Sequence, residues 1–224
     1  SDVNCSNFGG GVRPGDRLVL NSGTRGSLKI INCKGTANQP IEIRNDSGGS
    51  GPTVISRSSS KSGGFIFNCV DCEHVRINGT GGWRGSEDLA RCGAANGNGA
   101  CGIKVTTTAS GDSPGVFLAI RGSSTNVVIQ GIEVDGRWPA LSRNGIGISV
   151  NDRDYSRSEH PGAWREDIVI SDNYIHHVEG ECIYAGPNWE YQLAADDLRL
   201  RNIDISNNLI TDCGWDGINL KSAI

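Results

Sequence analysis

A short pattern of apolar and polar positions recurs along most of the chain. It has the form apolar, any residue, isoleucine, polar, and its five copies are residues 41–44, 75–78, 127–130, 168–171 and 203–206. The central isoleucines, Ile43, Ile77, Ile129, Ile170 and Ile205, are separated by 34, 52, 41 and 35 residues. Successive side chains of a β-strand point to opposite faces, so each copy predicts one short strand.

A second column of short strands accompanies the first. Its copies are residues 64–67, 102–105, 147–150, 182–185 and 217–220. Recurring short strands are typical of a solenoid, in which each coil adds one rung to several parallel sheets around a narrow apolar core. The spacings of 34 and 35 residues suit a coil of three short strands and three turns. We expect residues 81–100, 135–143 and 151–166 to be loops inserted between coils.

The turns of the expected solenoid are rich in Asn, Asp, Gly and Ser. Asp172 and Asn173, and Asn207 and Asn208 one coil later, fall at a bend of the chain. Such bends need left-handed backbone, which Asn and Asp tolerate better than other residues with a side chain. We therefore predict a repeated turn at these two places.

Several segments resemble the right-handed parallel β-helix proteins of the pectate-lyase-like superfamily. They are residues 18–20, 22–30, 34–36, 40–45 and 206–210, and the likeness extends over nearly the whole chain. It implies an all-β, right-handed parallel β-helix, a solenoid with about three short strands per coil and loops inserted between coils. The chain is then a single β-helix domain, 1–224, or a fragment of a longer helix. This fold supports lyases, hydrolases, esterases, fibres and adhesins, so it does not specify the function.

The composition disfavours several other classes. Of the 224 residues 32 are glycine, and the long Leu- and Ala-rich stretches of a helical bundle do not occur. No apolar run approaches the roughly 18 residues that cross a bilayer, so we expect no membrane span. The formal net charge is -4, and Lys and Arg are scattered among Asp and Glu instead of forming a basic stripe. We therefore expect no nucleic-acid partner.

The eight cysteines form an even set without histidines at zinc-site spacing. This favours structural disulfides and a secreted protein, either extracellular or periplasmic. Cys69 and Cys72 form a C-x-x-C motif, but the flanking residues alternate like strands, whereas a redox motif needs a helix N-terminus. We interpret this motif as structural. From proximity in the expected loops we predict two disulfides, Cys5–Cys33 and Cys92–Cys101.

Alignment of the second column places polar residues of neighbouring coils side by side on the outer face of one sheet. We expect one row of Lys104, Ser149, Tyr184 and Asn219, with Thr106, Asn151, Gly186 and Lys221 beside it. Glu181 and Asp216 then stack just before the strands, above Asn144 or Ile146 depending on the register. We expect loops to overhang this face with Arg153, Arg157, His160, Arg165, Trp189, Glu190 and Tyr191. Together these residues predict a polar, aromatic and charged groove.

Such a groove suits the β-elimination of polymeric uronates. In that reaction the sugar carboxylate is neutralised, a base removes the proton of the neighbouring carbon, and an acid protonates the leaving oxygen. We predict Lys221 as the base and Tyr184 or His160 as the acid. The residues predicted to bind the substrate, an acidic polysaccharide, are Lys104, Arg153, Arg165, Trp189 and Asn219.

The stacked carboxylates need a compensating charge. Two carboxylates and an amide oxygen are hard ligands of the kind that Ca²⁺ prefers, and we predict Glu181, Asp216 and Asn144 as its ligands. A proton or a basic side chain would compensate the charge as well. The competing interpretation is that Glu181 and Asp216 cap turns through backbone hydrogen bonds, and that Lys221 is a solvated surface residue.

The segment Asp216-Gly-Ile-Asn-Leu-Lys221-Ser222 resembles the calcium-ligand-to-lysine segment of chondroitinase-B-like and alginate lyases. In those enzymes an acidic ligand precedes the catalytic lysine by five positions. The resemblance therefore implies Asp216 as a calcium ligand and Lys221 as the base. The chain departs from the family at Gly214, where a second acidic ligand is expected, and the family's catalytic arginine would lie beyond Ile224.

The sequence thus predicts a secreted, carbohydrate-active protein, an acidic-polysaccharide (uronate) lyase that acts by β-elimination. The alternative is a noncatalytic structural β-helix, such as a fibre, an adhesin or a surface-layer component. Only four residues follow the last expected strand, 217–220, and an uncapped coil exposes unpaired backbone groups that favour end-to-end self-association.

The Gly-His-Gly segment of polygalacturonases does not occur. The adjacent His176 and His177 are interpreted as ordinary turn residues.

Overall fold

The computed structural model describes residues 2–46, 51–57, 64–79, 101–108, 115–140, 145–150, 165–186 and 200–221. These residues form 19 short β-strands and one 3₁₀ turn, η1 (Phe8–Gly10). No helix in this part of the chain is long and apolar enough to cross a membrane.

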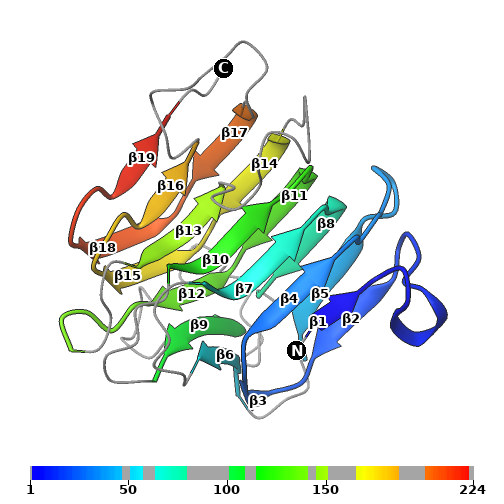
Figure 1. The fold of residues 1–224 in the computed structure, drawn as a ribbon, viewed down its shortest axis with the longest axis horizontal. Helices are drawn as coiled ribbons and strands as arrows, with labels where there is room; N and C mark the ends of the chain where they lie inside the picture. Colours follow the sequence, from blue (N-terminus) through cyan, green and yellow to red (C-terminus); the bar gives the residue numbers. More distant parts are fainter. Residues whose placement is uncertain are drawn as a thin grey trace.

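The strands form three sheets, and each sheet receives every third strand of the chain (Figure 1). Sheet A consists of β1 (Asp2–Asn4), β4 (Leu28–Ile31), β7 (Phe65–Val70), β10 (Val116–Arg121), β13 (Ile146–Val150), β16 (Ile183–Ala185) and β19 (Ile218–Leu220). Sheet B consists of β2 (Arg17–Leu20), β5 (Ile41–Asn45), β8 (Glu73–Asn78), β11 (Thr125–Gln130), β14 (Arg165–Ser171) and β17 (Leu200–Ser206). Sheet C consists of β3 (Gly23–Arg25), β6 (Thr53–Arg57), β9 (Ile103–Thr107), β12 (Ile132–Asp135), β15 (Tyr174–Val178) and β18 (Leu209–Cys213).

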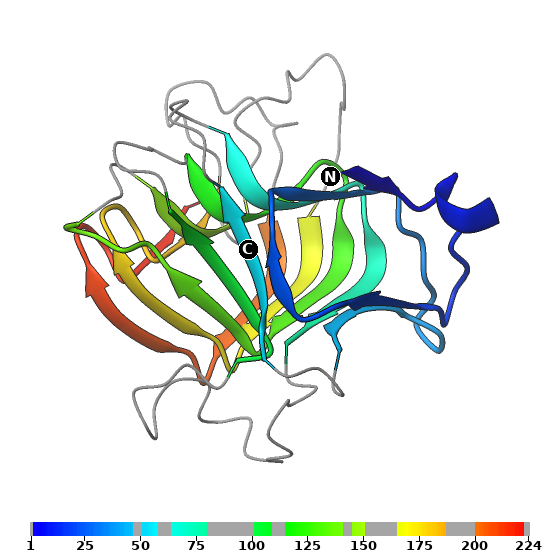
Figure 2. The ribbon, with the colours of Figure 1, turned by 90° about the horizontal axis from the view of Figure 1, so that it is seen from below.

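Neighbouring strands in all three sheets are parallel, and the chain passes from sheet A to sheet B to sheet C in every coil. The coils therefore stack in the order of the sequence, as Figure 1 and Figure 2 show from two sides. This arrangement confirms the predicted all-β parallel β-helix with three strands per coil. The described residues complete six coils, from β1 to β18, and β19 begins another.

The predicted isoleucine column lies in sheet B. Ile43 pairs with Ile77, Ile77 with Ile129, and Ile129 with Ile170, and all four side chains are fully buried. Ile205 continues the column in β17 and is only partly buried. Alternate residues of each strand point inward, so the three sheets enclose one continuous apolar core. Full burial of one such side chain contributes roughly 1.5–3 kcal/mol.

Asparagine side chains reinforce the turn between sheets B and C. Asp172 and Asn207 have left-handed backbone, with φ of 55° and 54°, as predicted for this bend. The asparagines that follow them form a ladder between coils: Asn208 Oδ1 accepts hydrogen bonds from the backbone N–H and Nδ2 of Asn173 at 3.0 and 2.9 Å. Asn173 Nδ2 also donates to the carbonyl oxygen of Ile129 at 3.1 Å. These bonds satisfy backbone groups that the turn would otherwise bury unpaired.

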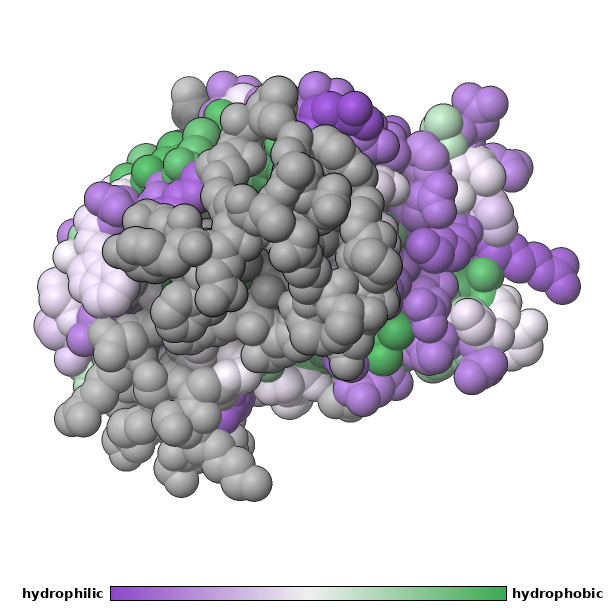
Figure 3. All heavy atoms as spheres, turned by 45° about the horizontal axis from the view of Figure 1, so that its top comes forward, coloured by the Kyte–Doolittle hydropathy of each residue, from purple (hydrophilic) through white to green (hydrophobic). Residues whose placement is uncertain are grey.

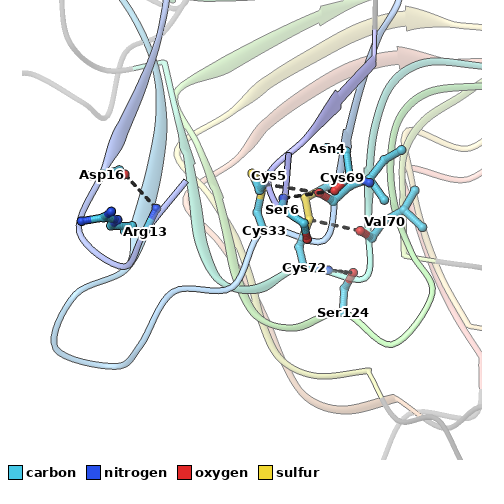
Figure 4. Close-up of a disulfide and its surroundings, with 11 residues drawn as sticks. Asn4, Cys5, Ser6, Arg13, Asp16, Cys33, Cys69, Val70, Cys72 and Ser124 are labelled. Carbon is cyan, nitrogen blue, oxygen red and sulfur yellow. Dashed lines mark hydrogen bonds between the residues drawn. A yellow bond between two sulfur atoms is a disulfide. The ribbon is translucent and has the colours of Figure 1, made fainter. Parts of the chain in front are cut away.

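Three disulfides connect described residues. They are Cys5–Cys33, Cys69–Cys72 and Cys182–Cys213. The first confirms a predicted pair and joins the segments that follow β1 and β4, and the second links β7 to the turn before β8 (Figure 4). The third joins the residue before β16 to the end of β18. Cys101 is also disulfide-bonded, whereas Cys92 of the predicted Cys92–Cys101 pair lies outside the described residues.

The second predicted column is wrong at one position. Strands β7, β13, β16 and β19 share sheet A, but residues 103–105 belong to β9 of sheet C. Their place in sheet A is taken by β10, where Ala119 pairs with Ser149. Lys104 therefore lies on a different sheet from Tyr184 and Asn219. The prediction failed because sheets A and C both contain short Gly-Ile-x-apolar segments, so the local pattern does not distinguish them.

Candidate functional site

Five residues of the predicted site lie together at the last described coils of sheet A. They are Glu181, Tyr184, Asp216, Asn219 and Lys221, and they come from β16, β19 and the residues beside these strands. Tyr184 pairs with Asn219 in the sheet register. The same offset of 35 residues places Glu181 next to Asp216, and this is the predicted stacking of the two carboxylates.

The carboxylates of Glu181 and Asp216 meet at the side chain of Asn219. Asn219 Nδ2 lies 3.4 Å from Glu181 Oε1 and 3.3 Å from Asp216 Oδ2, so it shares two long hydrogen bonds. Among the described residues, no basic side chain pairs with either carboxylate. If the amide rotates, Asn219 Oδ1 joins the carboxylates as a third oxygen donor, and this donor set fits Ca²⁺. Asn144, the remaining predicted ligand, lies outside the described residues.

The predicted base and acid lie near one another at the same corner. Lys221 Nζ is 5.7 Å from the centroid of the Tyr184 ring, and Tyr184 is 2% exposed. The main chain of Lys221 packs tightly against the preceding coil: a Cβ atom on Gly186 would lie 2.2 Å from the carbonyl oxygen of Lys221. Because only glycine fits there, the stacking of the coils fixes the point from which the lysine side chain extends.

The other predicted site residues do not join this group. Lys104 lies in β9 of sheet C. Arg165 begins β14 of sheet B and is 2% exposed, so it does not overhang sheet A as predicted. Arg165 was expected in the loop of residues 151–166, because the apolar pattern of residues 168–171 starts only after the first residues of β14. Arg153, His160 and Trp189 lie outside the described residues.

A second polar cluster, which the sequence analysis missed, lies on sheet C and is called here the sheet C cluster. It comprises Lys104, Glu133, Asp135, His176 and His177. Lys104 Nζ is 2.7 Å from Glu133 Oε1 and 2.8 Å from Asp135 Oδ2. His176 Nε2 lies 3.2 Å from the same oxygen of Glu133, and its Nδ1 lies 2.6 Å from Nδ1 of His177. The histidines thus belong to β15 and to a cluster that spans three coils, which corrects their interpretation as turn residues.

The ion pairs shift the titration of this cluster. Burial alone would raise the pKa of Glu133, but hydrogen bonds to His176 and Lys104 hold that pKa below its ordinary value. Burial also opposes ionisation of Asp135, yet the bond to Lys104 keeps the pKa of Asp135 low. The pKa of Lys104 is raised, since the hydrogen bonds to Asp135 and Glu133 outweigh the effect of burial. All three groups are therefore charged at neutral pH.

Acid is expected to weaken the fold through this cluster. A carboxyl group with a lowered pKa contributes stability that is present above its unfolded pKa, about 4, and is lost as the pH falls through the folded value. We expect the free energy of unfolding to fall between about pH 5 and pH 2, and to fall less in Lys104→Met. Urea denaturation at a series of pH values measures the difference.

Lys34→Met is the matched control for this experiment. Lys34 pairs with Glu73 at 3.7 Å, but both side chains are about half exposed, and pairs of this kind contribute little to stability. Its acid dependence should match that of the unsubstituted chain. Identical curves for Lys104→Met and Lys34→Met would contradict a stabilising role of the sheet C cluster.

A groove of about 650 Å³ lies on the outer face of sheet B. Its lining includes Arg17, Glu42, Arg76 and Asn78. Glu42 forms an ion pair with Arg17 Nε at 3.2 Å and accepts a hydrogen bond from Asn78 Nδ2 at 3.0 Å. The groove is polar and suits an extended polar ligand, and its described lining residues include no lysine or tyrosine. The groove on sheet B and the group around Lys221 beside sheet A therefore lie on different faces of the helix.

No protein-family model matches the chain, and no curated protein is similar to it in sequence. Among solved structures, the chain is similar to an alginate lyase from Paenibacillus sp. str. FPU-7. The two share 16% sequence identity over 96% of this chain and 94% of that chain, with a TM-score of 0.28. The assignment of a parallel β-helix therefore rests on the strand pairing of the chain itself.

Proposed function

We propose that the chain is a secreted carbohydrate-active protein that binds an acidic polysaccharide and cleaves it as a uronate lyase, by β-elimination. One observation carries the proposal: the carboxylates of Glu181 and Asp216, which have no basic partner in the part of the chain that the structure describes, lie at the same corner of sheet A as Lys221 and Tyr184. This corner combines the groups that the reaction requires, namely a cation site, a base and an acid. The disulfides support an extracellular or periplasmic location.

Glu181 and Asp216 would hold Ca²⁺, with Asn219 and the predicted Asn144 as further oxygen donors. Bound there, Ca²⁺ supplies positive charge that neutralises the uronate carboxylate and makes the adjacent carbon more acidic. Before an ion binds, Asn219 Nδ2 lies between the two carboxylates, 3.4 Å from Glu181 Oε1 and 3.3 Å from Asp216 Oδ2, and rotation of the amide would turn Oδ1 toward the ion. In this proposal the sugar carboxylate would bind at the edge of β16 and β19.

Lys221 and Tyr184 then move the two protons of the reaction. The neutral amine of Lys221 accepts the proton from the carbon beside the carboxylate, and the electron pair of that C–H bond forms the new double bond. Tyr184, whose ring lies 5.7 Å from Nζ, donates its phenolic proton to the glycosidic oxygen as the C–O bond breaks. His160 is the alternative acid in the proposal. Arg153, Trp189 and Asn219 are proposed to bind the sugar chain.

The experiment is an absorbance assay for the unsaturated uronate product. Alginate, pectate and chondroitin are each incubated with the purified chain, in Ca²⁺ and in a chelator. We expect the absorbance to rise with at least one polymer, to stop rising after chelation and to resume when Ca²⁺ is restored. No rise with any polymer would contradict the lyase proposal, whereas a rise that a chelator does not affect would contradict only the role of Ca²⁺.

A noncatalytic structural role, with end-to-end self-association, is the second candidate. The last described coils expose four apolar side chains: Leu209 (37%), Trp215 (63%), Ile218 (46%) and Leu220 (53%). Figure 3 shows apolar patches in green at the left, on the side where these coils lie in Figure 1. Exposed apolar side chains that lie close together favour contact with another chain. Light scattering over a range of concentrations tests this, and a monomer at every concentration would remove its support.

A further inference from the structure

We infer that Asp135, His176 and His177 form a binding site for a transition-metal ion of the zinc type on the outer face of sheet C. Asp135 ends β12, and the two histidines lie in β15 of the next coil. Asp135 and His176 are direct partners in the sheet register, so two neighbouring strands present the three ligands side by side. The site lies on a different sheet from Glu181 and Lys221, and it does not depend on the proposed lyase function.

The three donor atoms have the spacing of a metal site. Nδ1 of His176 and Nδ1 of His177 are 2.6 Å apart, and each lies 3.9 Å from Oδ1 of Asp135. A triangle with these sides has a point about 2.1 Å from all three atoms, and Zn–N and Zn–O bonds are about 2.0–2.2 Å long. Two imidazole nitrogens at this distance cannot both carry a proton, so at least one lone pair faces that point.

Neighbouring side chains hold the ligands in a binding orientation. His176 Nε2 lies 3.2 Å from Glu133 Oε1, and a carboxylate partner keeps the proton on Nε2, which leaves the lone pair on Nδ1. Lys104 binds Asp135 through Oδ2 at 2.8 Å, so Oδ1 is left to face the histidines. Oδ1 accepts one hydrogen bond from the Arg137 N–H at 3.0 Å, which uses only one of its lone pairs. A carboxylate behind a metal-binding histidine is a common arrangement in metal sites.

The chemistry of the ligands selects the metal. Two imidazole nitrogens with one carboxylate suit Zn²⁺, Ni²⁺ or Cu²⁺, whereas Ca²⁺ prefers oxygen ligands. The side chains of His176 and Asp135 are 8% and 16% exposed and that of His177 is 46% exposed, so solvent reaches the site. A fourth coordination position is open to water. The competing explanation of the 2.6 Å contact is a single proton shared between the two Nδ1 atoms.

Metal binding here would connect two consecutive coils. A ligand that binds only the folded chain lowers the unfolding equilibrium constant by the factor 1 + [L]/Kd, which is about 100-fold at 100 times Kd. The expected signature is therefore a rise in the midpoint of thermal unfolding that grows with the concentration of Zn²⁺. Ca²⁺ should not produce this rise through the same residues.

The test uses the untagged, oxidised full chain, stripped with a chelator and titrated with ZnCl₂ by calorimetry and by thermal unfolding. His177→Asn removes one ligand, and asparagine tolerates the left-handed backbone at this position, where φ is 52°. His74→Asn is the matched control, because His74 has φ of 49° and lies in β8 of sheet B. We expect one Zn²⁺ per chain, an affinity loss of at least about 10-fold in His177→Asn and in Asp135→Asn, and no loss in His74→Asn.

Two results would overturn the inference. If the unsubstituted chain binds no Zn²⁺, the histidine contact is a shared proton. If Zn²⁺ binds with the same affinity to His177→Asn and Asp135→Asn, it binds at other residues, such as the carboxylates of sheet A. Circular dichroism in chelator shows whether the variants fold. Should they not fold, visible bands of Co²⁺ bound to the unsubstituted chain report nitrogen ligands directly, and their absence would count against the site.

Discussion

Replacement of Lys221 by alanine is expected to abolish uronate cleavage while leaving the fold intact. Loss of a positioned general base typically lowers the rate by about 10²–10⁴-fold. The side chain follows β19 and is not part of the core column, so the thermal midpoint should stay close to that of the unsubstituted chain. Initial rates of product absorbance, measured beside a melting curve of the same sample, separate loss of activity from loss of structure.

Lys29→Ala provides the matched control for Lys221→Ala. Lys29 lies in β4 of the same sheet, where it pairs with Asn68, several coils away from the carboxylates of Glu181 and Asp216. Removing this lysine changes the net charge equally but should leave the rate unchanged. Turnover by Lys221→Ala at the rate of the Lys29→Ala chain would show that Lys221 is not the base, even if the protein is a lyase.

Truncation of Ile129 to alanine is expected to destabilise the folded chain by about 2–5 kcal/mol. Ile129 is fully buried between Ile77 and Ile170 in the column of sheet B, so the truncation leaves a cavity between two coils. Neighbouring coils are held by their own hydrogen-bond ladders and cannot close around this cavity. Equilibrium denaturation in guanidinium, with the disulfides intact, measures the loss.

Ile205→Ala makes the same chemical change at the last described position of the column. Ile205 pairs with Ile170 but is only partly buried, so the truncation removes less apolar contact and leaves no closed cavity. Its cost should be about 1 kcal/mol or less. If both truncations cost the same, the core would not be the continuous stack that the strand pairing indicates, or further chain would cover β17.

The sequence predicts sheet B well because its core positions repeat without ambiguity. Each copy of the apolar-x-Ile-polar pattern is one strand of that sheet, and Ile43, Ile77, Ile129 and Ile170 are vertical neighbours. The pattern works because a β-helix repeats one short strand per coil, and a register shift of one residue would expose the isoleucine. The stacked carboxylates of sheet A were predicted for the same reason.

The position of Lys104 could not be predicted in the same way. The interval from Ile77 to Ile129 is 52 residues and includes the segment 81–100, so the offset between neighbouring coils is not constant there. Without a fixed offset, the segment Gly-Ile-Lys-Val fits sheet A as well as sheet C. The segment can be assigned to sheet A or sheet C only by counting the strands that separate it from the strands of the neighbouring coils. The structure is needed for that count.

The sheet C cluster could have been found from the sequence. Ile129 and Ile170 are 41 residues apart, and the same offset of 41 connects Asp135 with His176. Extending the alignment of the isoleucine column by six residues would have placed an aspartate next to two histidines. The contact with Lys104 could not be predicted in this way, because Lys104 lies within the interval of 52 residues and its offset to Glu133 is 29 residues, not 41.

The disulfides Cys5–Cys33 and Cys182–Cys213 span 28 and 31 residues, so each closes a covalent ring around a single turn of the solenoid. Each coil of a solenoid contacts only its neighbours, so a coil can open locally when its contacts to one neighbour are lost. Crosslinking a loop of about 30 residues removes roughly 3–4 kcal/mol of chain entropy from the unfolded ensemble. In the oxidised protein these two coils therefore cannot open strand by strand, whereas a reducing environment would remove this restriction.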